Sequence, residues 1–310
     1  IRDRHIHGGF GIDFSLCKAD DFIEFSKKIL KYGVCAFFPT LATDTVENLQ
    51  KQISEIKKAM QLQENSLEPL AKVLGVHLEA CFLNPVKKGI HDENLLLKPT
   101  IENFKLLEDD IIKIVTLAPE LDEGNLLCAY LKEKGIRVSA GHCMGADLSH
   151  VDQVTHLYNA MGAFSHRTQS TVVSALCNDN IYTEIIADGI HVQKDVLNIT
   201  FRTKPLNKII LISDALPITH SDKDSMDFCS KKVFLQNGKA VDSNGTIAGS
   251  TAFVYDIIKM LVNQGMLDLR TACAMASKNL TYIQDLNSQL YWDSSCNIQA
   301  MNINGSLVTF

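Results

Sequence analysis

The sequence lacks several features that would place it in common functional classes. No apolar run reaches the roughly 18 residues that span a bilayer, and no secretory signal opens the chain. Positive charge is not in excess, since the net charge is −6 and the isoelectric point is near 5.9. These absences predict a soluble, cytoplasmic protein with neither a nucleic acid nor a membrane as partner.

Paired cysteine motifs and nucleotide-binding loops are also absent. The nine Cys residues are odd in number, form no C-x-x-C pair and fall in apolar runs such as residues 34–37. We therefore expect reduced core residues, not disulfides or zinc ligands. No Gly-rich phosphate loop follows an early strand, which argues against a Rossmann-like open sheet, the competing layout for an α/β chain.

What the chain does contain is an alternation of short strands and amphipathic helices. Its 310 residues are 46% hydrophobic and 21% charged, enough to bury the core of one large domain. Helical patterns such as 20–32, 43–61, 125–134 and 193–203 follow most of the strands. The expected strands are residues 2–7, 34–39, 73–79, 111–117, 136–140, 153–156, 182–187 and 209–213. Eight such units predict an α/β fold of the (β/α)8 TIM-barrel type.

The pattern changes after Asp214. Short strands at residues 232–235 and 239–242 precede two helices that begin near Thr251 and Leu267, and a β-like tail ends the chain. We predict a barrel over residues 1–275, with inserted strands near 230–245. The tail, residues 276–310, is expected to contribute to a small, incomplete β-sandwich appendage, which a segment preceding Ile1 would complete.

Histidines and acidic residues follow many of the predicted strands directly. His5 and His7 lie two apart, so on one strand their side chains project to the same side. The carboxyl ends of barrel strands share one rim, where active sites lie. The residues predicted to meet there are His7, Glu79, His142, His156, His191 and Asp214. Imidazoles and carboxylates suit zinc or a similar divalent ion that activates water, and Asp214 suits a proton carrier. The pattern predicts a metal-dependent hydrolase.

Some of these residues have simpler interpretations. A lone His-x-His is often an ordinary surface or core pair. His77 lies one layer deeper than Glu79 and is expected to be a hydrogen-bonded core histidine. His191 could equally support a neighbouring site residue, Arg167 could form an ordinary interface ion pair, and Lys87-Lys88 suits a solvated face.

Several motifs, in order and spacing, resemble a known family. They extend from residue 3 to about residue 255 and are far more specific together than singly. The motifs are His5-Ile6-His7-Gly8, Gly75-Val76-His77-Leu78-Glu79, Gly89-Ile90-His91, Leu117-Ala118-Pro119-Glu120, Ser139-Ala140-Gly141-His142, Thr155-His156-Leu157-Tyr158-Asn159-Ala160-Met161, His166-Arg167, Ala187-Asp188-Gly189-Ile190-His191-Val192, Ile212-Ser213-Asp214-Ala215 and Gly245-Thr246-Ile247-Ala248-Gly249-Ser250. The chain resembles the N-acetylglucosamine-6-phosphate deacetylases of the amidohydrolase superfamily.

The resemblance implies an enzyme that hydrolyses the acetamide of an amino sugar 6-phosphate. It implies one or two divalent ions, zinc or iron, and a homodimer in which Arg167 reaches the neighbouring subunit's site. The implied roles are principal metal ligands Glu79, His142 and His156; a second metal pair His5 and His7, with Glu79 bridging; acid/base Asp214; an oxyanion donor, His91; sugar or phosphate contacts His91, Asn159, Ala160, Arg167 and His191; and a closing segment at Ile247.

The chain also departs from the family pattern. Ala80-Cys81 stand where the family has Gly-Pro, and Thr168-Gln169 replace an acidic-Pro turn. Two alternatives therefore stay open: an amidohydrolase acting on a cyclic amide or a deaminase-type substrate, and an inactive metal-binding paralogue. The first is disfavoured because such relatives often use a carboxylated Lys at the end of the fourth strand, whereas Lys113 lies inside its predicted strand.

Overall fold

The central element of the computed structural model, which describes residues 1–279 and 287–310, is a parallel sheet. Its strands follow one another in chain order around the sheet, and β5 (Lys72–Val73) pairs with β4 at the margin. The eight strands of the main path are β1 (Arg2–Ile6), β4 (Ala36–Ala42), β6 (Val76–Glu79), β7 (Ile112–Leu117), β8 (Arg137–Ala140), β9 (Gln153–Val154), β10 (Tyr182–Ile185) and β11 (Ile209–Leu211). Each overlaps a predicted strand.

The sheet is nearly closed into a barrel because the segment after β11 returns to β1. The Asp214 amide donates to the His5 carbonyl over 2.8 Å, and the His7 amide donates to the Ala215 carbonyl over 2.9 Å. Ile6 and Ala215 form a parallel bridge. The strands are buried almost throughout, which explains why they read as apolar runs in the sequence. The expected barrel-type α/β fold is confirmed.

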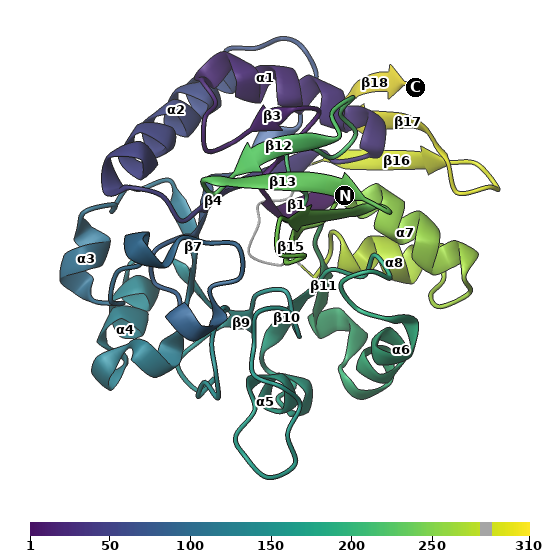
Figure 1. Ribbon diagram of the computed structural model, residues 1–310. Coiled ribbons are helices and arrows are strands. Elements are labelled where there is room, and N and C mark those ends of the chain that lie inside the picture. The colour runs from purple at the N-terminus through teal and green to yellow at the C-terminus, as the bar shows by residue number, and fades with distance from the viewer. Residues whose placement is uncertain (280–286) are drawn as a thin grey trace.

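Helices surround the sheet (Figure 1). The longest one, α2, begins after Thr45, whose hydroxyl accepts the Asn48 amide, and it buries one stripe that includes Leu49, Ile53 and Ile56. The α-helices are α1 (Ala19–Lys28), α2 (Val46–Glu64), α3 (Ile101–Lys105), α4 (Leu126–Glu133), α5 (Thr171–Cys177), α6 (Lys194–Thr203), α7 (Val254–Asn263) and α8 (Leu269–Met275). None of the helices in the described part of the chain is both long and apolar enough to cross a membrane.

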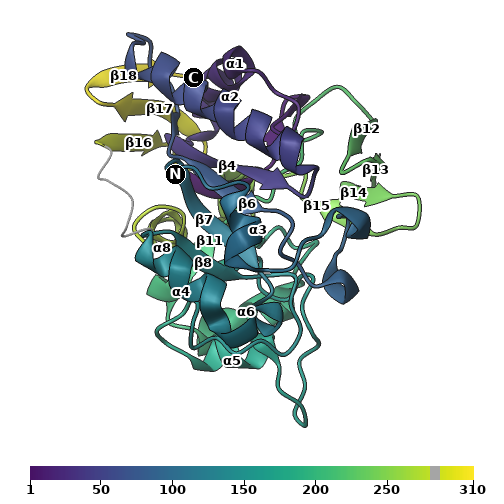
Figure 2. The same ribbon diagram turned by 90° about the vertical axis from the view of Figure 1, so that its left-hand side faces the viewer.

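In the part of the chain that the structure describes, three antiparallel sheets accompany the barrel. The first pairs β2 (Gly8–Gly9) with β3 (Ile12–Asp13). The second contains β12 (Ser225–Phe228), β13 (Lys231–Gln236), β14 (Lys239–Asp242) and β15 (Ile247–Gly249). The third contains β16 (Ser288–Trp292), β17 (Ile298–Ile303) and β18 (Ser306–Thr309). The second and third sheets lie on opposite sides of the molecule (Figure 2).

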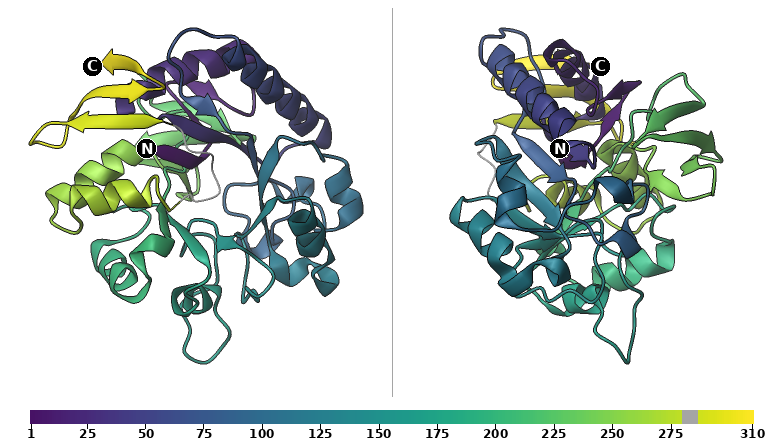
Figure 3. Two further views of the ribbon diagram at one scale, coloured as in Figure 1. Left: turned by 180° about the vertical axis from the view of Figure 1, so that it is seen from behind. Right: turned by 60° about the vertical axis from the view of Figure 1, so that its left-hand side comes forward.

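The β16–β18 sheet packs on the barrel beside the start of the chain. Ser288 hydrogen-bonds to Cys35, Lys259 of α7 hydrogen-bonds to Asn297, and the rings of Tyr255 and Trp292 lie 5.9 Å apart. Both chain ends lie on this side of the molecule (Figure 3). The proposed division at residue 275 stays a prediction, and residues 280–286 of the tail lie outside the described residues.

Candidate metal centre and active-site cavity

A cavity of about 280 Å³ lies at the carboxyl ends of the barrel strands. The β12–β15 sheet forms part of its wall through Phe228 and Ile247, and the Phe228 ring lies edge-on to His7 with centroids 5.4 Å apart. Most of the predicted site residues line it: His7, Glu79, His91, His142, His156, Asn159, Ala160, His191, Asp214 and Ile247. The residues that follow separate strands therefore meet at one end of the barrel, as the motif positions predict.

Glu79, the last residue of β6, joins two pairs of histidines. Its Oε2 atom lies 3.2 Å from Nε2 of both His5 and His7. Its other oxygen, Oε1, lies 2.9 Å from His156 Nε2 and 3.3 Å from His142 Nε2. One carboxylate thus presents a different oxygen to each pair, which is the geometry of a bridging ligand.

Asp214 faces only one of the two pairs. Its Oδ1 atom lies 3.3 Å from His5 Nε2 and 3.1 Å from His7 Nε2. Its side chain keeps 11% of its surface exposed, so the carboxylate borders the cavity. The site therefore divides into a group of four donor residues, His5, His7, Glu79 and Asp214, and a group of three, Glu79, His142 and His156.

Contacts on the far side of the rings orient two of these imidazoles. His7 Nδ1 lies 3.1 Å from the Thr40 carbonyl, and His142 Nδ1 lies 2.8 Å from the Lys87 carbonyl. A carbonyl can only accept, so each Nδ1 carries a proton and Nε2 is the nitrogen that faces the cluster. His5 is held similarly, with Nδ1 3.4 Å from Glu184 Oε2.

The cluster fits a divalent metal. Zinc bonds of about 2.0–2.2 Å place neighbouring tetrahedral ligands about 3.3–3.6 Å apart, and the donors here are separated by similar distances. The His5 and His7 Nε2 atoms lie 3.3 Å apart, and those of His142 and His156 lie 3.2 Å apart. Such nitrogen pairs need a proton or a cation between them. The group of three leaves a coordination position open, as catalytic sites do.

The charges within the cluster shift the acidities of its members. Burial lowers the pKa of His7, but hydrogen bonds to Asp214 and Glu79 outweigh burial and raise the pKa to about 9. Burial likewise opposes the charge on Glu79, yet the positive charge of His5 keeps the pKa of that carboxyl well below its usual range. Without metal, protons on the imidazoles therefore balance the carboxylates.

Three residues of the cluster have backbone in the left-handed region: His142 at φ 47°, His156 at φ 31° and Asp214 at φ 49°. Non-glycine residues adopt this region rarely and at a cost of about 1–3 kcal/mol. Each lies two or three residues after the end of its strand, where the chain turns, and its side chain lines the cavity. This turn also ends β9 at Val154, two residues before the predicted end.

Two further histidines line the cavity. His191 Nδ1 lies 2.7 Å from Asp188 Oδ2, and the other oxygen of Asp188 accepts the Ile190 and His191 amides over 2.8 Å. Asp188 is therefore a turn residue that also orients His191. Burial, with the charge of His142 adding to it, lowers the pKa of His91 well below its usual range.

One predicted substrate residue lies elsewhere. Arg167 is exposed in the segment between β9 and α5, its Nε atom lies 3.0 Å from His166 Nε2, and it does not line the cavity of its own chain. Conversely, Lys87 does line the cavity, although its Lys-Lys sequence favours a solvated face. The downstream Gly89-Ile90-His91 motif was the available signal that this loop belongs to the site.

His77 lies inside the barrel, as expected of a core histidine. Its Nε2 atom lies 2.8 Å from Thr116 Oγ1, and its Nδ1 atom lies 3.2 Å from the Arg4 carbonyl. Burial lowers its pKa to about 3, so it is neutral. Arg4, whose carbonyl contacts His77, also forms a fully buried ion pair with Glu184, in which Arg4 Nε lies 2.6 Å from Glu184 Oε1.

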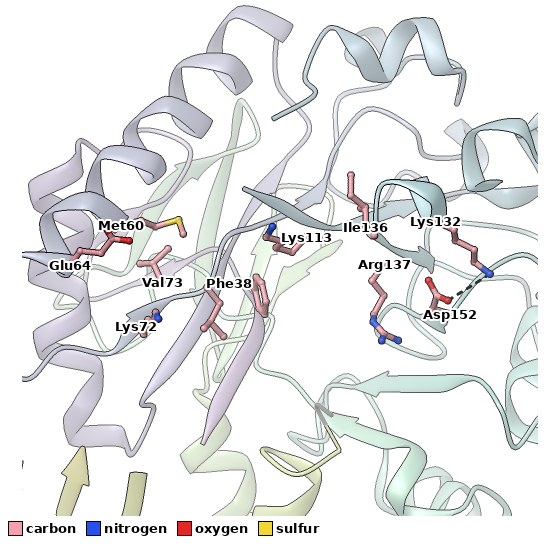
Figure 4. A pocket seen from close by; sticks show the side chains of 12 residues that line it. Phe38, Met60, Glu64, Lys72, Val73, Lys113, Lys132, Ile136, Arg137 and Asp152 are labelled. Carbon is pink, nitrogen blue, oxygen red and sulfur yellow. Dashed lines mark ion pairs between the residues drawn. The ribbon is translucent and has the colours of Figure 1, made fainter. Parts of the chain in front are cut away.

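A larger cavity, of about 660 Å³, lies at the opposite end of the barrel, where the strands begin (Figure 4). Lys72, Lys113, Lys132 and Arg137 line it together with apolar side chains such as Phe38. Lys132 pairs with Asp152 over 3.6 Å, and Lys113 donates to the Asp110 carbonyl over 2.7 Å. This cavity contains no histidine, so we place the candidate site in the smaller one.

Comparisons with known proteins agree with this geometry. The chain is 32% identical over 278 residues to the N-acetylglucosamine-6-phosphate deacetylase of Bacillus subtilis (strain 168), covering 86% of this chain and 68% of the relative. It is 30% identical to the deacetylase of the same name from Bos taurus, covering 99% of this chain and 81% of the relative. The solved deacetylase from Pasteurella multocida superposes with a TM-score of 0.89 at 26% identity, covering 100% of this chain and 85% of that one. No family model matches the chain.

Proposed function

The chain belongs to the N-acetylglucosamine-6-phosphate deacetylase family, and we propose that it hydrolyses N-acetylglucosamine-6-phosphate to glucosamine-6-phosphate and acetate. The observation that carries the proposal is the buried cluster in which Glu79 joins two histidine pairs beside Asp214. That cluster forms part of the wall of a cavity at the barrel end where such enzymes work.

Glu79, His142 and His156 would hold the principal ion, because this group leaves a position open for a ligand from solvent or substrate. His5 and His7, with Glu79 shared, would hold a second ion. The donor set suits zinc, with iron as the other candidate. When bound, the divalent ion polarises the acetyl carbonyl and lowers the pKa of water toward about 7.

Asp214 would act as the general base and then as the general acid. Its carboxyl group is ionised and so has a lone pair free to accept a proton, because the positive charge of His5 outweighs burial and lowers its pKa below the usual range. It borders the cavity, so it can take a proton from the attacking water and return it to the leaving amine. His91 would donate a hydrogen bond to the acyl oxygen as negative charge develops on it.

The sugar phosphate would be held by the remaining lining residues. Asn159, Ala160 and His191 line the cavity, as does Ile247 of the β12–β15 sheet. Arg167 would come from the neighbouring subunit of a homodimer, which agrees with its exposed position outside its own chain's cavity. A guanidinium matches the geometry of a phosphate.

Acetate release from N-acetylglucosamine-6-phosphate by the protein purified without chelator tests the proposal. We expect metal-dependent release that requires the 6-phosphate, with the unphosphorylated sugar as the matched substrate control. Bound metal without release would contradict the deacetylase and direct the search to other amides. The absence of both metal binding and release would instead indicate an inactive paralogue.

A further inference from the structure

The ring of His91 is held at one edge by a single residue, Thr43, which directly follows β4. The Thr43 backbone amide donates to His91 Nδ1 over 3.2 Å. The Thr43 hydroxyl oxygen lies 2.9 Å from the same nitrogen. Both groups are buried, His91 being 3% exposed and Thr43 4%. Forty-eight positions separate the two residues, so the contact depends on the fold.

These contacts decide which nitrogen carries the proton. A backbone amide can only donate, so His91 Nδ1 must accept, and the single proton of the neutral ring lies on Nε2. The Thr43 hydroxyl has a partner on its other side, because the Cys81 amide donates to its oxygen over 3.1 Å. The hydroxyl hydrogen is therefore left to donate to Nδ1 as well.

The Nε2 edge of the ring is consequently the edge that can donate a hydrogen bond in the cavity. His91 lines the cavity and lies edge-on to His142, with ring centroids 4.8 Å apart. A proton on Nδ1 would point at the Thr43 amide hydrogen, so the contact also opposes the cationic ring. His91 is thus set up to donate one hydrogen bond and not to carry protons.

We propose that Thr43 is a positioning residue that fixes His91 as the neutral tautomer with its proton on Nε2, ready to donate to the acyl oxygen of the substrate. The catalytic consequence rests on the proposed deacetylase function, whereas the tautomer itself does not. Asp214 is then the group that moves protons, and His91 is the group that donates a hydrogen bond.

Nitrogen-15 NMR of the zinc-loaded protein with labelled histidine tests the tautomer directly. His91→Gln identifies the His91 signals by their loss. We expect an unprotonated Nδ1 and a protonated Nε2 at neutral pH. A proton on Nδ1, or a doubly protonated ring, would overturn the proposal whether or not the protein is a deacetylase.

Two substitutions at Thr43 test the role of the hydroxyl. Thr43→Val should lower kcat by about tenfold, as expected for loss of one buried hydrogen bond, and move the His91 Nδ1 shift. Thr43→Ser should restore both readouts, which guards against a folding defect. If Thr43→Val folds and leaves the His91 shift and kcat unchanged, the positioning role is wrong; if Thr43→Ser behaves like Thr43→Val, the hydroxyl is not responsible.

Discussion

At the scale of single residues, the carboxylates of the site have separable tasks. Glu79 contacts all four histidines of the cluster, whereas Asp214 contacts only His5 and His7. Replacing Glu79 would therefore disturb both candidate metal positions, but replacing Asp214 leaves the group of three intact. This difference makes Asp214 the cleaner target for separating proton transfer from metal binding.

Asp214→Asn should lower the rate of acetate release by about 10²–10⁴-fold, the usual contribution of a general acid–base group. An amide cannot accept the proton from water, yet it preserves the shape of the side chain. The bound metal, measured by elemental analysis of the purified variant, should stay at one equivalent or more. Full activity in this variant would rule out the acid/base assignment.

Metal affinity should depend on pH because protons and metal compete for the same nitrogens. The raised pKa of His7, about 9, means that the metal-free site holds a proton below that pH. An ion that binds to His7 must release this proton, so the affinity of that ion should fall by up to about tenfold per pH unit for each displaced proton as pH decreases below about 9. Zinc competition with a chromogenic chelator measures the slope, and affinity that does not change with pH would contradict the argument.

At the scale of elements, a buried ion pair connects β1 and β10, the two strands on either side of β11 where the barrel closes. Arg4 of β1 and Glu184 of β10 are both fully buried. Glu184→Gln should lower the free energy of unfolding by about 3–5 kcal/mol, because it removes one member of a buried ion pair. Urea unfolding of the metal-free protein measures the change, since Glu184 also contacts His5.

The double substitution Arg4→Met with Glu184→Leu is the matched control for that experiment. It removes both charges and fills a similar volume, so it should be more stable than Glu184→Gln alone. The losses of stability in Arg4→Met alone and Glu184→Leu alone give the sum to compare. If the double variant loses as much stability as that sum, the pairing of the charges does not account for the loss.

The strands could be predicted from the sequence because they are buried on both faces and read as short apolar runs. The candidate site could be located because its residues directly follow those runs. What the sequence does not encode locally is the direction of each side chain. The left-handed backbone at His142, His156 and Asp214, and the contact between Thr43 and His91, arise only when distant segments pack together.

Ends of elements were less predictable for the same reason. The helix expected from Thr43 begins at Val46, because Thr45 caps it while Thr43 is engaged with His91. The helix expected from Leu267 begins at Leu269, after Asp268 accepts the Thr271 amide. In both cases a side-chain hydrogen bond outside the apolar pattern decides where the helix starts.

At the scale of the whole molecule, the antiparallel sheets occupy different positions relative to the cavity. The β12–β15 sheet contributes Phe228 and Ile247 to the cavity wall, while the β16–β18 sheet packs near the start of the chain on the other side (Figure 2). Of these two sheets, the β12–β15 sheet lines the cavity, so it is the one placed to affect substrate access. Arg167 belongs to neither and lies outside the cavity of its own chain.

A shared site in a homodimer predicts complementation between two inactive variants. Arg167→Gln should impair use of the phosphorylated substrate, and Asp214→Asn should remove the acid/base. In a mixed dimer, the chain that keeps Asp214 receives Arg167 from its partner, so one of the two sites is complete. Random pairing of equal amounts should restore about one quarter of the wild-type activity.

The mixing experiment needs subunit exchange, which co-expression of two differently tagged chains provides. Arg202→Gln, a substitution of an exposed arginine in α6, is the matched control and should retain wild-type activity and its phosphate requirement. If Arg167 served its own chain's cavity, the mixed dimer would contain two defective sites and activity would stay at the level of the separate variants. Restoration would therefore assign Arg167 to the neighbouring site and establish the dimer as the functional unit.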